Sequence, residues 1–252
     1  MKRLWRALYW NVLHPVHRAW HVRRAAAGDR KKLRAVQLVQ PYTMVGFERL
    51  MNAYDVVRRA EEKGLQGAIV ECGVYKGGSA AVMTMAASPQ RRIWLFDSFE
   101  GLPEPTAEDG EKAVEYSGHR VSGALEPIGQ CVGPLDVVKE LFFEKLAIDP
   151  SRVMIRQGWF QETLPSARYE IGAIAVLRLD GDWYDSTKVC LENLYDLVVP
   201  GGFVIIDDYG YWEGCKRAVD EFLAARNLDV RLVTVDDSGV WFTVPSPLRG
   251  EG

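Results

Sequence analysis

Short apolar runs alternate with helix-like segments along most of the chain, and this alternation restricts the fold more than any other feature. Each run is rich in β-branched or aromatic residues and is bounded by turn formers, which is typical of a buried strand. The predicted strands are residues 67–74, 92–98, 152–158, 173–180 and 203–208. The predicted helices are residues 46–63, 77–88, 135–148, 186–198 and 215–227. Such alternation predicts an α/β fold with a mostly parallel sheet and helices on both of its faces.

The last part of the chain has a different pattern. Residues 229–245 contain two β-rich runs on either side of "DDSG", which indicates a hairpin turn. We therefore expect a seven-stranded sheet in which this C-terminal hairpin pairs in antiparallel fashion and one strand runs against the others.

One long segment does not fit this alternation. Residues 99–134 contain many turn formers and show little periodicity. A loop of this length in a compact domain is typically a lid or a disordered segment. We expect it to form a lid over the functional site.

The beginning of the chain is strongly basic, since residues 1–34 hold ten of the 31 Lys and Arg residues against one acid, Asp29. We interpret residues 1–40 as a basic amphipathic arm and residues 41–252 as one domain. Polar residues interrupt the apolar part of the arm before it reaches the length of a signal peptide or a membrane span, so we expect neither export nor a transmembrane helix.

The apolar residues of the arm recur at helical spacing. A basic, Trp-rich stripe is typical of a helix on an anionic membrane surface, which would give residues 1–34 a peripheral membrane contact. Apolar stripes more commonly pack on the protein body or on a partner subunit, so a homo-oligomer is also expected. Nucleic acid is disfavoured as a partner, because the rest of the chain has no matching basic face or motif.

The cysteines are far apart and include no C-x-x-C pair. This spacing indicates reduced thiols in a cytoplasmic protein and argues against a zinc site. The four residues are Cys72, Cys131, Cys190 and Cys215.

Acidic residues stand where the predicted strands end, and ligands of an open α/β sheet bind beyond those ends. Asp180 closes the fourth strand, and Asp207 and Asp208 close the fifth. Three carboxylates crowded together repel one another unless they are protonated or bridged by a cation. Oxygen-only ligands predict Mg²⁺, with Mn²⁺ or Ca²⁺ as alternatives. The competing interpretation is that one or two of these residues cap helices and face solvent.

Asp182 lies two residues beyond Asp180, on the same side of an extended chain. If it does not bind the metal, it is the predicted general base, close to a hydroxyl whose acidity the metal raises. Trp183 and Tyr184, which follow it, either shape an acceptor pocket or pack in the core, and the sequence leaves both roles open.

The first strand leads into a turn rich in glycine, "ECGVYKGGSA", at residues 71–80. Gly73, Gly77 and Gly78 either let the backbone approach a ligand ahead of a helix or simply serve a tight turn. Asp97, at the end of the second strand, is suited to accept both hydroxyls of a ribose, although Asp also commonly caps a following turn. Together these features predict a ribose-bearing cofactor.

Eight segments of the chain resemble the macrocin O-methyltransferase family, bacterial enzymes that methylate sugar hydroxyls on macrolide and aminocoumarin natural products. The resemblance runs from residue 41 to residue 244, so it leaves the arm outside. The segments are "PYTMVGFERL", "VECGVYKGGSA", "WLFDSFEGLPEP", "GWFQETLP", "LRLDGDWYDST", "PGGFVIIDDYG", "GCKRAVDEF" and "SGVWF".

The resemblance implies a class I methyltransferase (Rossmann-like) fold, S-adenosylmethionine as methyl donor and Mg²⁺ as required metal. It implies that Asp180, Asp207 and Asp208 bind the metal and that Asp182 is the base. "PYTMV" is similar to a lid segment over the donor. The implied donor-binding residues are Glu71, Gly73, Tyr75, Gly78, Ser79, Asp97, Ser98, Gly158, Trp159 and Asp180.

The mechanism implied by the resemblance is an in-line methyl transfer. Two vicinal sugar oxygens bind the metal, Asp182 removes a proton from one of them, and the alkoxide attacks the sulfonium methyl group. The acceptor stays open: an antibiotic sugar, a cell-surface glycan precursor or a lipid-linked saccharide all fit.

Other functions remain as alternatives. The "DGD" at residues 180–182 is also typical of a metal-dependent nucleotide-sugar glycosyltransferase, and together with "IIDD" it mimics a haloacid-dehalogenase-type phosphatase. The arm would also suit a non-catalytic, membrane-docked partner that binds the donor without turnover.

Overall fold

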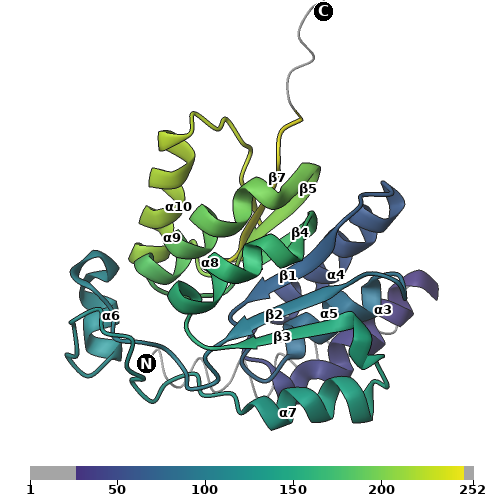
Figure 1. Cartoon of the computed structure of the whole chain (residues 1–252), viewed down its shortest axis with the longest axis horizontal. Coiled ribbons are helices and arrows are strands. Elements are labelled where there is room, and N and C mark those ends of the chain that lie inside the picture. The colour runs from purple at the N-terminus through teal and green to yellow at the C-terminus, as the bar shows by residue number, and fades with distance from the viewer. Residues whose placement is uncertain (1–26, 247–252) are drawn as a thin grey trace, which may run out of the picture.

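A single seven-stranded sheet forms the centre of the computed structural model, which describes residues 27–246 (Figure 1). The strands are β1 (Ala68–Cys72), β2 (Ile93–Asp97), β3 (Val153–Gln157), β4 (Ile174–Leu179), β5 (Val198–Ile206), β6 (Val233–Thr234) and β7 (Val240–Thr243). Their order is β3-β2-β1-β4-β5-β7-β6. The first five pair in parallel, β7 is antiparallel to β5, and β6 is antiparallel to β7. The predicted mostly parallel sheet with a C-terminal hairpin and one antiparallel strand is confirmed.

Helices cover both faces of the sheet (Figure 1). They are α3 (Ala27–Val39), α4 (Phe47–Glu62), α5 (Gly78–Ala86), α6 (Gly110–Tyr116), α7 (Leu135–Lys139), α8 (Phe160–Ile171), α9 (Tyr184–Leu194) and α10 (Glu213–Ala225). A π-helical turn, η4 (Glu140–Lys145), continues α7. The short 3₁₀ turns are η2 (Gln40–Tyr42), η3 (Ala107–Asp109), η5 (Pro150–Arg152) and η6 (Tyr195–Leu197).

Alternate residues of the central strands belong to two separate cores. Ile69 of β1 packs with side chains of α3, α4 and α5, whereas Ala68 and Val70 pack with those of α8, α9 and α10. Successive side chains of a strand point to opposite faces, so a central strand covered by helices must be apolar throughout. Every residue of β1 and β4 is buried. This explains why these strands read as nearly unbroken apolar runs.

Strand β5 begins earlier than predicted. It starts at Val198, so the "PGG" at residues 200–202, which we expected to be a turn before the strand, lies inside it. Val198 pairs with Ile174, and the register between β4 and β5 shifts between Ile174 and Val176. This irregularity accommodates the proline and the glycines within a paired strand.

Helix α8 is absent from the sequence prediction. Pro165 lies inside it, and a proline is expected to interrupt a helix because it lacks the backbone N–H and clashes with the preceding turn. Leu164, Ala167 and Ile171 are buried against the sheet. Their packing compensates for the lost hydrogen bond.

Only residues 27–40 of the predicted arm belong to the described part of the chain. Leu33, Val36 and Val39 of α3 are buried, and the last two belong to the core that contains α4 and α5. This stretch of the arm therefore packs on the body, whereas the expected packing of the apolar stripe itself falls outside the described residues. The stripe near the beginning of the arm and its predicted membrane contact lie outside the described residues. Within residues 27–246, no helix is both long enough and apolar enough to cross a membrane.

Residues 99–134 are mostly irregular, as predicted, but carry η3 and α6. Hydrogen bonds fix the segment at several points. The Leu102 N–H donates to the Gln130 carbonyl (3.0 Å), and the Ile128 N–H donates to the Leu102 carbonyl (2.9 Å). The Trp183 indole N–H donates to the carbonyl of Pro103 (2.9 Å). The segment is thus attached both to itself and to the body.

Candidate active site

A cavity of about 770 Å³ lies at the carboxyl ends of the central strands. The predicted site residues that line it are Gly73, Tyr75, Ser79, Asp97, Ser98, Trp159, Asp180, Asp182, Asp207 and Asp208. Glu71, Gly78 and Gly158 are not among the lining residues, and Glu71 is completely buried. The cavity is the size of a typical small-molecule site.

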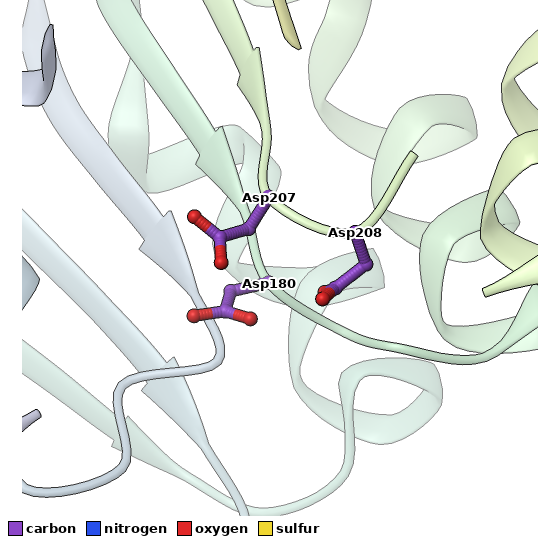
Figure 2. A group of neighbouring side chains, drawn as sticks. All are labelled: Asp180, Asp207 and Asp208. Atoms are coloured by element: carbon purple, nitrogen blue, oxygen red, sulfur yellow. The ribbon is translucent and has the colours of Figure 1, made fainter. Parts of the chain in front are cut away.

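Three aspartates converge on one point of this cavity (Figure 2). Carboxylate oxygens of Asp180, Asp207 and Asp208 all lie within 4.8 Å of one another. The backbone brings them together because the parallel pairing continues past the strand ends. The Asp180 N–H donates to the Cys72 carbonyl (2.8 Å), and the Asp207 N–H donates to the Leu179 carbonyl (2.9 Å).

Two arginines that sequence reasoning missed are bound to this cluster. Arg178, buried in β4, donates to Glu71 (2.6 Å) and Asp180 (2.9 Å) through one nitrogen and to Asp207 through the other. Arg49 of α4 contacts the second oxygen of Asp207. The cluster therefore has two cations of its own. The sequence contains a signal for one of them, because Arg178 stands within the apolar run "AIAVLRL".

The two arginines do not neutralise the whole cluster, which comprises five acids: Glu71, Asp180, Asp182, Asp207 and Asp208. Burial and the charge of Asp182 raise the pKa of Asp208 well above its ordinary value. Burial also raises the pKa of Asp207 and raises that of Glu71 to about 7, although Arg178 lowers both. Burial is the main cause of these shifts, and five acids beside two arginines leave the carboxylates to repel one another as well.

The residues present fit a hard divalent cation. Asp208 Oδ2 is buried and has no hydrogen-bond partner among the described residues, although buried polar atoms are normally paired. All three convergent side chains offer oxygen, which is the ligand type of Mg²⁺ and Mn²⁺. A cation would supply the missing partner and reduce the repulsion.

Asp182 reaches the cavity in a way that the sequence did not predict. Instead of continuing an extended strand, it stands in a three-residue turn with φ 56°, closed by the Trp183 N–H donating to the Gly181 carbonyl (2.5 Å). One of its oxygens, Oδ1, accepts a hydrogen bond from the Trp212 indole (2.6 Å). Burial, and then repulsion from Asp180, raise its pKa to about 8.

The glycine-rich turn after β1 packs directly against the end of β4. Gly73 has φ 88°, and a Cβ placed on it would lie 1.8 Å from the Asp180 carbonyl oxygen. Gly78 begins α5, where a Cβ would lie 2.8 Å from the Tyr42 carbonyl oxygen. The "PYTMV" segment therefore lies on the N-terminus of α5, and its residues 43–45 line the cavity.

Asp97 caps the neighbouring turns, as the alternative interpretation expected. Its Oδ2 accepts the N–H groups of Val74 (2.7 Å) and Tyr75 (2.9 Å), and its Oδ1 accepts the Phe99 N–H (2.6 Å). Burial raises its pKa although these three bonds lower it. Asp97 also lines the cavity, so capping and ligand binding are compatible.

The next strand end contributes the residues ahead of α8. The Gly158 N–H donates to the Asp97 carbonyl (3.0 Å), which extends the pairing of β2 with β3, and Trp159 then lines the cavity. Ser98 lines the same region, and its hydroxyl donates to the Gly101 carbonyl (3.1 Å). Of the predicted donor-binding residues, seven line the cavity, Gly158 lies in the turn beside it, Gly78 begins α5, and Glu71 is buried within β1.

Aromatic residues that the sequence did not single out share the cavity with Asp182. Tyr116, Tyr211 and Trp212 line the cavity. Trp183 is 1% exposed and packs in the core, and Tyr184 is also buried, with its hydroxyl donating to Glu221 (2.6 Å). Of the two roles left open for Trp183 and Tyr184, the structure favours packing.

The sheet order, the cavity at its carboxyl edge and the acids gathered there define a class I methyltransferase, an S-adenosylmethionine-dependent O-methyltransferase. The family model "Macrocin-O-methyltransferase (TylF)" matches residues 3–244, and the chain belongs to this family. The match begins at residue 3, so it includes the arm that the sequence motifs left outside the resemblance.

Relatives and a solved structure agree with this assignment. An 8-demethyl-8-(2,3-dimethoxy-alpha-L-rhamnosyl)-tetracenomycin-C 4'-O-methyltransferase of Streptomyces olivaceus is 38% identical over 205 residues, 80% of this chain and 75% of the relative. A demethyldecarbamoylnovobiocin O-methyltransferase of Streptomyces niveus is 36% identical over the same shares. The structure of the O-methyltransferase NovP superposes with a TM-score of 0.70 at 33% identity, over 81% of this chain and 83% of NovP.

Proposed function

We propose that this protein uses S-adenosylmethionine and Mg²⁺, or Mn²⁺ in its place, to methylate a sugar hydroxyl of a glycosylated natural product. The observation that carries the proposal is the convergence of three aspartates beside a fourth, Asp182, in one cavity. When bound, a hard dication lowers the pKa of a hydroxyl that it coordinates, and the donor supplies an electrophilic methyl group.

Asp180, Asp207 and Asp208 would hold the metal. Their convergence and the unpartnered Oδ2 of Asp208 support this role. Arg178 holds Asp180 and Asp207 from the protein side, and so fixes two of the three carboxylates before any ligand enters.

The turns after β1, β2 and β3 would hold the donor. Asp97 Oδ2 already accepts two N–H groups, so Oδ1, which accepts one, is the oxygen with capacity for a ribose hydroxyl. Ser79 and Glu71 lie at the methionine end in this proposal, and Trp159 lies near the adenine. The full proposed set is Glu71, Gly73, Tyr75, Gly78, Ser79, Asp97, Ser98, Gly158, Trp159 and Asp180.

Asp182 would act as the general base. It would accept the proton of the acceptor hydroxyl. The donor, when bound, would supply the methyl group for the new O–CH3 bond, with its S–CH3 bond broken and S-adenosylhomocysteine leaving. A positioned base contributes about 10²- to 10⁴-fold to such a reaction. Positioning of the two reactants by the cavity walls supplies much of the remainder.

The acceptor would enter through the side of the cavity formed by residues 99–134, which we propose as a lid. Leu102, Pro103, Tyr116 and Cys131 of this segment line the cavity. The two relatives are named as O-methyltransferases of a rhamnosyl-tetracenomycin and of demethyldecarbamoylnovobiocin, so these compounds are the first acceptors to test.

The test is a methyl-transfer assay on the purified protein with these two acceptors and with methyl α-L-rhamnopyranoside. Mass spectrometry should detect a product that is one methyl group heavier, with Mg²⁺ but not with EDTA. Asp182→Asn should abolish turnover while calorimetry still detects donor binding. Undiminished turnover in EDTA would contradict the metal site, and undiminished turnover of Asp182→Asn would remove Asp182 from its role.

A further inference from the structure

The proposed base occupies an unusual backbone position. Asp182 is the central residue of a turn closed by the Trp183 N–H and the Gly181 carbonyl, and its φ is 56°. A γ-turn with a positive central φ is rare and strained, and residues other than glycine seldom adopt it. Such strain persists only where the surroundings hold it in place, and it is concentrated at functional sites.

The Asp182 side chain is held by Trp212, which precedes α10. The indole N–H of Trp212 donates to Asp182 Oδ1 at 2.6 Å, a short N–H···O hydrogen bond. Because Oδ1 is engaged in this way, Oδ2 is the oxygen available to a hydroxyl in the cavity. Trp212 is 4% exposed, so the bond is shielded from water.

The Trp212 ring is in turn fixed by other aromatic residues. Trp183 (4.8 Å between ring centroids), Tyr211 (4.9 Å) and Tyr116 (5.4 Å) all meet it edge to face. The ammonium group of Lys112 lies 4.6 Å from its centroid. Tyr116 and Lys112 belong to α6, within residues 99–134, so the proposed lid contacts the residue that holds the base.

We propose that Trp212 is a positioning residue for methyl transfer: it fixes the Asp182 carboxylate so that Oδ2 faces the acceptor hydroxyl. The inference rests on the proposed function, in which Asp182 is the base. Among the described residues, Trp212 makes the one side-chain hydrogen bond to the Asp182 carboxylate, so loss of this bond would let the carboxylate turn away from the hydroxyl.

The chain contains a matched control. Trp183 belongs to the same aromatic group, and its indole N–H also makes one hydrogen bond, but to the Pro103 carbonyl (2.9 Å). Trp212→Phe and Trp183→Phe therefore remove the same group from neighbouring rings. Only the first removes a bond to Asp182.

The first experiment is spectroscopic and needs no turnover. In ¹⁵N-indole-labelled protein, the two Phe variants assign the Nε1–H signals of Trp212 and Trp183. We expect Asp182→Ala to shift the Trp212 signal upfield, because its acceptor is lost, and to leave the Trp183 signal nearly unchanged. A Trp212 signal that does not respond to Asp182→Ala would overturn the proposal.

The second experiment measures kinetics with the two acceptors named above. Trp212→Phe should lower kcat about 100-fold, which is the effect of an approximately 1 Å misplacement, and should leave the KM for S-adenosylmethionine and the affinity for Mg²⁺ unchanged. Trp183→Phe keeps an aromatic ring against Trp212 and the bond between Trp212 and Asp182, so it should lower kcat much less than Trp212→Phe does. Equal losses in both variants would reduce Trp212 to a packing residue. If Asp182→Asn kept its turnover, the proposed base would fail, independently of the result for Trp212.

Discussion

Gly73 lies in the turn that we propose to hold the donor and packs against Asp180, a proposed metal ligand, so replacing it tests how tightly the site is built. At φ 88°, an alanine costs about 1–2 kcal/mol of backbone energy. Its Cβ would also lie 1.8 Å from the Asp180 carbonyl oxygen, where contacts below 3.0 Å are essentially never found. Relief of the clash requires a movement of more than about 1 Å, and overpacking of this kind costs about 1–3 kcal/mol more.

That movement is opposed on both sides of Gly73. Its N–H donates to the Phe96 carbonyl (2.9 Å), and the Asp180 N–H donates to the Cys72 carbonyl (2.8 Å). The turn and Asp180 are therefore tied to the same strand ends. We expect Gly73→Ala to lower the free energy of unfolding by about 2–5 kcal/mol and to weaken Mg²⁺ binding, because Asp180 is displaced.

Gly64 provides the matched control. It follows α4 with φ 64°, and a Cβ there would have no atom within 4 Å. Gly64→Ala should cost only the backbone part, about 1–2 kcal/mol, and leave metal binding intact. Guanidinium denaturation and Mg²⁺ titration of both variants would measure the difference. Equal destabilisation by the two substitutions would refute the steric argument.

Three further predictions concern charge. Mg²⁺ at about 100 times its Kd should stabilise the parent by about 2.7 kcal/mol in thermal denaturation, and Asp208→Asn should lose most of this effect. Burial and repulsion from Asp180 raise the pKa of Asp182 from 3.8 to about 8. The contribution of the protonated carboxyl to the free energy of unfolding is therefore fully present below pH 3.8 and is lost as pH rises through about 8. Asp182→Asn should therefore match the parent near pH 4 in EDTA and exceed its melting temperature near pH 9; parallel pH curves would contradict this. Glu61 accepts hydrogen bonds from Arg91 (2.5 Å) and from the Ser88 N–H (3.0 Å). Burial raises the pKa of Glu61, but these bonds lower it more, so its pKa lies below the ordinary 4.5. The contribution of ionised Glu61 to the free energy of unfolding is thus present above pH 4.5 and is lost as pH falls through its lowered pKa. Glu61→Gln should therefore cost about 2 kcal/mol near pH 7 and much less near pH 3, as measured by denaturant titration.

The sheet could be predicted from the sequence because its central strands are covered on both faces. Such strands must be apolar throughout, and their ends show where charge first becomes tolerable. Asp180, Asp207 and Asp208 could be assigned to one edge for this reason, without knowledge of strand order. The register of β4 and β5 then set their distances, which no pattern in the sequence contains.

The parts that could not be predicted depend on contacts between distant segments. Arg49 reaches Asp207 across 158 positions, and Trp212 reaches Asp182 across 30. Nothing near either residue in the sequence indicates its partner. Helix α8 shows the opposite difficulty, since the local signal of Pro165 was clear but was outweighed by burial of the neighbouring apolar residues.

Arg178 changes the argument for a metal rather than removing it. An acidic cluster alone indicates a cation only if the protein supplies none, and this protein supplies two guanidinium groups. Both arginines are bound to Asp207, and neither contacts Asp208, whose Oδ2 has no partner among the described residues. Asp208 also lines the cavity, together with Asp180 and Asp182. A cation that entered through the cavity would therefore meet Asp208 and Asp180 next to the carboxylate that would receive the acceptor's proton.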